Sequence, residues 1–285
     1  MNILNLCVTN IIAFLVLSVC FDQAYKVATK TSKKDGALTV LLEFMAAIIA
    51  FICIPFFELK FPTDIKTYLL FIGTIVFFAI TDRLNTTVRR GIEASTFNML
   101  RQIATVFIMI AGVLIFKESL IITKVIGAIL IIFSNILIFY KKEKIKFNKY
   151  LGLGILANIT FTVAMLMEIE ASIYFNPAFF IGMTLLGPAI LITLFERIKI
   201  SDIKEEFKIG NKKAIFVTAI TWGLSILAQV RAYNLGDVTL VAPLCALTVI
   251  LNVIAGYMFL NEKDNISKKI IAGILITISV FLIKG

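Results

Sequence analysis

Long apolar runs separated by short connections constrain this chain more than any other feature of its sequence. A helix needs about 20 residues to cross roughly 30 Å of hydrocarbon. Ten runs of this length follow one another along the 285 residues. The sequence therefore predicts an all-α membrane protein with ten transmembrane helices, at residues 4–25, 37–57, 67–88, 93–116, 120–140, 150–172, 177–195, 213–233, 238–260 and 268–284.

The composition agrees with this fold class. Apolar residues make up 60% of the chain and charged residues 16%, and the mean hydropathy is +0.98. A soluble domain keeps about a quarter of its residues charged, because its surface must stay hydrated. Too little charge is present here to cover a water-facing surface, so most of the surface is expected to face lipid.

The net charge of +10 does not indicate a nucleic-acid partner, because Lys and Arg lie between the apolar runs and not in stripes with exposed aromatic residues. Most of them follow the first, third, fifth, seventh and ninth segments. Cytoplasmic loops retain Lys and Arg, so this asymmetry places these connections in the cytoplasm and both termini outside. We expect a multi-pass protein of a bacterial-type cell membrane.

The residues needed for most catalytic or metal sites are missing. The sequence contains no His, and its four Cys lie inside apolar runs at no metal-like spacing. The common zinc sites and Ser-His triads are thereby excluded. A phosphate-cradling Gly-rich loop and a nucleophile elbow are also absent from the sequence. We therefore expect neither an enzyme nor a bound cofactor.

Two distant stretches of the chain resemble each other. Residues 93–118 align without gaps on residues 237–262, and an Ile-Ala-Gly run occurs at the same place in both. Each stretch is followed by a Lys-bearing link and a last apolar helix. The matched positions include Glu93 with Asp237, Leu100 with Leu244, Gly112 with Gly256 and Glu118 with Glu262.

This similarity predicts two related five-helix repeats, residues 1–142 and 143–285, within one integral membrane domain. Because five is an odd number, the second repeat must enter the membrane upside down relative to the first. Inverted repeats are a transporter architecture, since two similar halves can rock about a central site.

The pattern of Glu93–Glu118, repeated at Asp237–Glu262, resembles the drug/metabolite transporter superfamily in its ten-helix EamA-like branch. The resemblance implies a 5+5 inverted fold around a central cavity. Different members use this cavity for amino acids, nucleotide sugars, amphipathic drugs and other metabolites. The family often opens its first helix with a Trp-Gly pair, and this chain has neither residue in its first segment.

Polar residues inside the apolar segments are the candidates for a substrate site, because an ionisable group at mid-helix costs about 2.5–3.5 kcal/mol. Arg101 lies about 12 Å along the fourth segment, at 1.5 Å per residue. Asn98, Arg101 and Gln102 share one helix face, which we expect to point into the bundle. Glu43 lies at a similar depth in the second segment and is the expected partner of Arg101. The two form a structural pair, or line the cavity where substrate competes for them, or do not meet.

Three further residues complete the predicted substrate site. Trp222, the only tryptophan, lies mid-helix, where it either packs or offers a stacking surface for an aromatic or cationic substrate. Gln229 and Asn252 are interior polar residues whose alternative role is hydrogen bonding between helices.

The remaining ionisable residues are assigned to the ends of the segments. Asp22 and Asp82 are expected close enough to the interface to reach water. Glu168 and Glu170 are expected to be solvated at the outer mouth. Near residues 196–212, the spacing of Ile203 and Phe207 predicts a short amphipathic surface helix that ends at Gly210.

The sequence thus predicts a secondary transporter that moves a small metabolite by alternating access through a central cavity. An amino acid or another zwitterionic or amphipathic organic molecule would suit its mixed charges. The expected partners are this substrate, membrane lipids and a candidate coupling ion. A translocase for a lipid-linked head group is the alternative that shares the fold, and an intramembrane enzyme or an interaction protein are the alternatives of other classes.

Overall fold

Most of the predicted apolar segments coincide with a described helix to within a few residues at their ends, and the ninth is divided between two helices. The computed structural model describes residues 3–30, 32–91, 94–119, 121–139, 149–260 and 266–284, and these ranges contain no strand. The helices are α1 (Ile3–Thr29), α2 (Asp35–Ile52), η1 (Ile54–Phe56), α3 (Ile65–Gly91), α4 (Ala94–Leu114), α5 (Ile122–Phe139), α6 (Lys149–Ser172), α7 (Pro177–Glu196), α8 (Ile200–Ile209), α9 (Lys212–Leu235), α10 (Val238–Cys245), α11 (Thr248–Leu260) and α12 (Ile266–Lys284).

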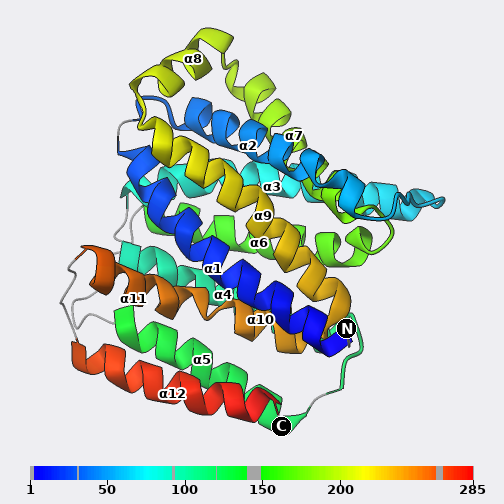
Figure 1. The fold of residues 1–285 in the computed structure, drawn as a ribbon, viewed down its shortest axis with the longest axis vertical. Coiled ribbons are helices and arrows are strands. Elements are labelled where there is room, and N and C mark those ends of the chain that lie inside the picture. Colours follow the sequence, from blue (N-terminus) through cyan, green and yellow to red (C-terminus); the bar gives the residue numbers. More distant parts are fainter. Residues whose placement is uncertain are drawn as a thin grey trace.

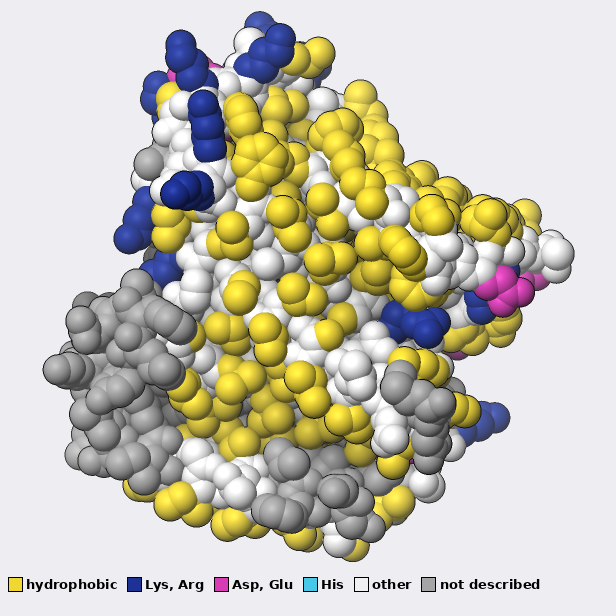
Figure 2. Space-filling view, viewed as in Figure 1, with side chains coloured by type: hydrophobic (Ala, Val, Ile, Leu, Met, Phe, Trp, Pro, Cys, Tyr) yellow, Lys and Arg dark blue, Asp and Glu magenta, His cyan; other side chains and the backbone are white. Residues whose placement is uncertain are grey.

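Six of the described helices are long and apolar enough to cross a membrane, namely α1, α2 with η1, α3, α6, α7 and α9. Shorter apolar stretches lie in α4, α5 and the α10–α11 pair. Figure 2 shows hydrophobic side chains spread over the middle of one face, with Lys and Arg side chains gathered toward its edges. Many large apolar side chains are exposed along these helices, which is unusual for a surface in water. These features indicate a membrane protein.

Helices from distant parts of the chain pack in pairs. The extensive contacts join α1 with α9, α3 with α6, α2 with α7, and α5 with α12. Figure 1 shows these helices running in a common direction through the molecule, with both chain ends at one end of the bundle. The connections that carry most of the described Lys and Arg residues, including α8, lie at the other end, which we call the basic end.

The backbones of α2 and α9 come unusually close together. A Cβ atom at Gly223 of α9 would lie 2.6 Å from the carbonyl oxygen of Ala46 on α2, closer than a side chain tolerates. Ala46 is fully buried, and so are Ala47 and Ala50 beside it. Small residues at this crossing therefore allow close packing between the two helices.

The ninth predicted segment is broken into α10 and α11. Pro243 lies inside α10 and lacks the N–H group that would continue the helical hydrogen bonding. The carbonyl oxygen of Ala246, just beyond α10, accepts a hydrogen bond from Nδ2 of Asn135 on α5 at 3.0 Å. The same oxygen also accepts the backbone N–H of Val249 at 3.2 Å, so the buried Asn135 side chain adds a second hydrogen bond to the backbone at the break.

The two similar stretches, residues 93–118 and 237–262, meet where the end of α4 contacts the start of α10. The carboxylate of Glu118 accepts backbone N–H bonds from Val238 at 2.6 Å and Thr239 at 2.8 Å. Its negative charge thereby lies at the positive end of the α10 dipole. The matching residues Glu93 and Glu262 lie outside the described residues.

The predicted amphipathic helix is confirmed as α8, which ends at Gly210. Ile203 and Phe207 pack against a buried cluster that includes Tyr25 of α1 and Leu38 of α2. The apolar face of α8 therefore covers the basic end of α1 and α2.

The polar side of α8 binds the connection between α1 and α2. Oε1 of the buried Glu206 accepts hydrogen bonds from the backbone N–H groups of Lys33 and Lys34, at 2.9 and 2.7 Å. Nζ of Lys34 also lies 2.7 Å from Asp202. This hydrogen bond is the main reason that the pKa of Asp202 lies below its usual value.

Candidate functional site

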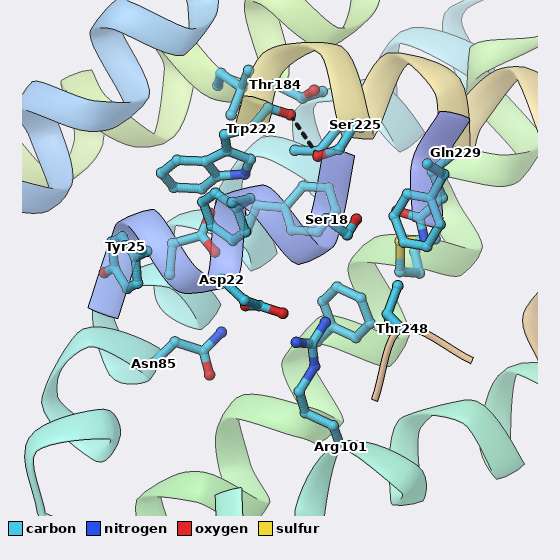
Figure 3. A pocket seen from close by; sticks show the side chains of 18 of the residues that line it. Ser18, Asp22, Tyr25, Asn85, Arg101, Thr184, Trp222, Ser225, Gln229 and Thr248 are labelled. Atoms are coloured by element: carbon cyan, nitrogen blue, oxygen red, sulfur yellow. Dashed lines mark hydrogen bonds between the residues drawn. The ribbon is translucent and has the colours of Figure 1, made fainter. Parts of the chain in front are cut away.

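A cavity of about 160 Å³ lies inside the bundle, between α1, α2, α3, α4, α6, α7, α9 and α11. Figure 3 shows the side chains around it. On α1 the lining residues run from Phe14 to Tyr25, and on α3 they run from Phe78 to Asn85. Most of these residues lie in the second half of their helix, so this part of the cavity wall is nearer to the basic end.

Arg101 lines this cavity from α4, as the sequence predicts for an interior position. Figure 3 shows its guanidinium directed toward the carboxylate of Asp22, which comes from α1 on the other side of the cavity. Opposite charges of the two helices thus face each other within the cavity. The side chains of Asn98 and Gln102, predicted to lie beside Arg101, are outside the described parts of the structure.

Asn252 holds Asp22 in place from α11. Its Nδ2 donates a hydrogen bond to Oδ2 of Asp22 at 2.7 Å. Its Oδ1 accepts a hydrogen bond from Nε2 of Gln23 at 3.1 Å, which fixes the orientation of the amide. Asn252 was predicted to bind substrate or to join helices, and the structure places it in a contact between α11 and α1.

Aromatic and hydroxyl groups form the wall between α1 and α9. Trp222 lines the cavity, and its ring lies 5.3 Å from that of Phe21. Phe21 in turn stacks on Tyr25 at 5.5 Å. The hydroxyl of Tyr25 lies 3.2 Å from that of Thr86, which is 2.7 Å from the hydroxyl of Thr39. This chain of hydroxyl groups ties α1, α2 and α3 together beside the cavity.

Gln229 also lines the cavity, as predicted, and lies about two helical turns beyond Trp222 on α9. Together with Arg101 it borders a second, smaller cavity of about 50 Å³ toward Tyr233 and Cys245. The interior space therefore continues past the main cavity toward α10.

Glu43 does not line the cavity. Its side chain on α2 is fully buried. Its ionisable neighbour is the carboxyl of Asp82 on α3, which does line the cavity. The structure thus sets Glu43 behind another acid, whereas the sequence predicts that it faces Arg101.

Glu168 corrects the prediction that it is solvated at the outer mouth. Its side chain on α6 is 1% exposed and lines the central cavity. Neither of its oxygens has a hydrogen-bond donor within the described part of the chain. By contrast, Glu170 two residues later is partly exposed and lies 3.9 Å from Lys66.

The structure brings together Arg101, Trp222 and Gln229 of the predicted residues. It adds Asp22, Asp82 and Glu168, which were assigned to the ends of their helices. One signal in the sequence could have identified the two aspartates, because each shares a helix face with another polar residue three or four positions away. These pairs are Ser18 and Asp22 on α1, and Asp82 and Asn85 on α3. The same signal does not identify Glu168, since the lining residues that precede it at this spacing on α6 are the apolar Phe161 and Met165.

Among the described residues, no group of three His, Cys, Asp or Glu side chains is placed to hold a metal ion. The described lining of the cavity offers charged groups, hydrogen-bonding groups and aromatic surfaces.

Comparisons with known proteins identify the fold and nothing finer. No family model and no curated protein matches the chain. Twenty-nine chains of solved structures do match it. One of them, described only as "Crystal structure of protein", superposes with a TM-score of 0.71 over 96% of this chain and 97% of its own, at 13% sequence identity. This chain therefore shares its fold with that solved structure, although only 13% of the aligned residues are identical.

Proposed function

We propose that this protein is a secondary transporter, which moves a small metabolite across the cell membrane by alternating access through the central cavity. The observation that carries the proposal is the composition of the cavity wall. Helices α1 to α4 line it from the first predicted repeat, and α6, α7, α9 and α11 line it from the second. A relative movement of the two repeats would therefore change which end of the cavity is open.

The helix packing supports ten spans in two inverted repeats. In this assignment α1 to α5 form the first repeat, and α6, α7, α9, the broken α10–α11 and α12 form the second. Exchanging equivalent helices turns the α1–α9 pair into the α6–α3 pair, and it leaves α2–α7 and α5–α12 unchanged. A two-fold relation between the repeats accounts for all four pairs.

Membership of the drug/metabolite transporter superfamily, in its EamA-like branch, is part of this proposal. It rests on the repeated Ile-Ala-Gly and Glu pattern. We place the protein in a bacterial-type cell membrane with the basic end in the cytoplasm, because cytoplasmic loops retain Lys and Arg.

Cysteine accessibility tests both the function and the orientation. In a variant without the native cysteines, Ser18→Cys places a thiol on the cavity wall. A transporter should expose it to a membrane-impermeant maleimide from each side in turn, in right-side-out and inside-out vesicles. Labelling from one side only, under every condition, would contradict alternating access.

Two positions serve as controls for that experiment. Lys204→Cys on the exposed side of α8 should react only from the cytoplasmic side. Labelling of this thiol in intact cells would show that the orientation is opposite to the one proposed. Thr277→Cys lies exposed on α12, where we expect lipid, and should react poorly from either side.

A further inference from the structure

Glu168 occupies an unusual environment for a carboxyl group. It is 1% exposed and lies on a membrane-spanning helix, and both of its oxygens lack a donor among the described residues. A buried polar group without a partner is strongly unfavourable, and ionisable residues at membrane depth are retained mainly for function. Because Glu168 also lines the cavity, a ligand in the cavity can reach it.

The charges around the cavity favour a positively charged ligand. Its described lining contains the three acids Asp22, Asp82 and Glu168, against Arg101 as the basic residue. Figure 3 shows Arg101 directed at Asp22, and Glu43 adds a further carboxyl behind Asp82. The described lining therefore contains more carboxyl groups than basic groups.

Aromatic rings supply the remainder of such a site. Phe14, Phe78, Phe161 and Trp222 all line the cavity, and the rings of Phe78 and Phe161 lie 6.2 Å apart. Aromatic faces attract organic cations and also pack against an apolar body. A small cavity with these walls suits a molecule that has one charged group and a compact apolar part.

We propose that Glu168 binds the protonated amine of the transported molecule, and that the substrates are small organic amines with an aromatic or aliphatic body. This inference rests on the proposed function, because it takes the cavity to be the substrate site. A positive nitrogen beside Glu168 would give its two oxygens the hydrogen-bond donors that the described residues do not supply.

The single tryptophan provides a direct test of this proposal. Because Trp222 is the only one in the chain and lines the cavity, its fluorescence reports occupancy of the site. The purified full chain in detergent would be titrated with phenethylamine, 3-phenylpropionate and 2-phenylethanol, which differ mainly in charge. The expected result is a saturable change with phenethylamine at millimolar concentrations or below, and binding of the other two that is at least about tenfold weaker.

Two variants on the same helix then identify the residue responsible. Glu168→Gln removes the charge at constant size and should weaken phenethylamine binding by about tenfold or more, without lowering the melting temperature. Glu170→Gln is the matched control, since Glu170 is not part of the cavity wall, and should bind as the parent does. The titrations of the unmodified chain test the preference for amines even if neither variant folds.

Three results would overturn the inference, namely tighter binding of 3-phenylpropionate, no response to phenethylamine, or undiminished amine binding by Glu168→Gln. The accessibility experiment with Ser18→Cys needs no ligand. Alternating labelling together with failed amine binding would therefore reject the amine proposal and leave the transporter proposal standing. One-sided labelling together with Glu168-dependent amine binding would reject the transporter proposal and leave Glu168 as a binding site for amines.

Discussion

The carboxylate of Glu118 accepts a hydrogen bond from the N–H of Thr239 at 2.8 Å, and thereby joins the loop after α4 to the first turn of α10. This contact links the two predicted repeats at the end opposite to α8. It also gives a physical reason for part of the duplicated sequence, because a carboxylate in this position satisfies N–H groups that have no partner inside the helix.

Two substitutions of Glu118 should destabilise the protein by different amounts. Glu118→Gln keeps one acceptor oxygen and loses the charge, so we expect a loss of about 1 kcal/mol. Glu118→Ala removes both hydrogen bonds, and we expect a loss of about 2–3 kcal/mol. Thermal denaturation in detergent measures both, with Ser119→Ala as the exposed neighbouring control. An unchanged midpoint for Glu118→Ala would show that the contact contributes nothing.

The glycine of the same motif should be equally sensitive. A Cβ at Gly112 would lie 3.0 Å from Cγ2 of Thr239 and 3.1 Å from Oε2 of Glu118. Gly112→Ala should therefore push α4 and α10 apart and cost about 1–3 kcal/mol. Gly273→Ala on α12 is the matched control, since nothing lies within 4 Å of its Cβ position. There the better helix propensity of Ala should leave the melting temperature unchanged or raise it.

The sequence predicts the helices well because each apolar run has the length that a membrane requires. It also identifies the duplicated stretch, although the partner of Glu118 becomes visible only when α10 is placed beside α4. The break between α10 and α11 is less predictable. Pro243 permits a bend, but the hydrogen bond that Asn135 of α5 donates to the carbonyl oxygen of Ala246 becomes visible only when α5 is placed beside the break.

The acids of the cavity were harder to place, because their predicted depth depends on where each helix ends. The sequence predicts that the first and third helices end near residues 25 and 88, whereas α1 continues to Thr29 and α3 to Gly91. Asp22 and Asp82 consequently lie deeper than predicted and reach the cavity. Glu168 lies near the end of α6, and only the packing of neighbouring helices determines that it is buried.

Glu206 should be essential for the attachment of α8. Its buried carboxylate accepts two backbone N–H groups from the connection between α1 and α2. Glu206→Ala should cost about 1–3 kcal/mol, because both donors lose a charged acceptor. Glu205→Ala removes an exposed partner of Lys33 and should change stability by less than about 1 kcal/mol. Equal melting temperatures for the two variants would contradict this assignment.

Acid should loosen α8 through Asp202. The hydrogen bond from Lys34 is the main cause that holds its pKa below the usual 3.8. A depressed pKa means that the unfolded chain takes up the proton at a higher pH than the folded chain. The contribution of Asp202 is therefore complete above about pH 4 and is lost as the pH falls through its folded pKa. Hydrogen–deuterium exchange of α8, corrected for intrinsic rates, should rise in this range, and Asp202→Asn should remove this acid-dependent part.

The sign of one stability change separates the two possible environments of Glu43. If Glu43 paired with Arg101, removing its charge would leave a buried guanidinium without a partner and cost about 3–5 kcal/mol. In the structure its neighbour is the carboxyl of Asp82, which is close enough to share a hydrogen bond with it. Glu43→Gln then replaces an acid beside an acid by an amide that can donate a hydrogen bond to Asp82. We expect the melting temperature to stay the same or rise. A loss of about 3–5 kcal/mol in the free energy of unfolding would instead show that Glu43 pairs with Arg101.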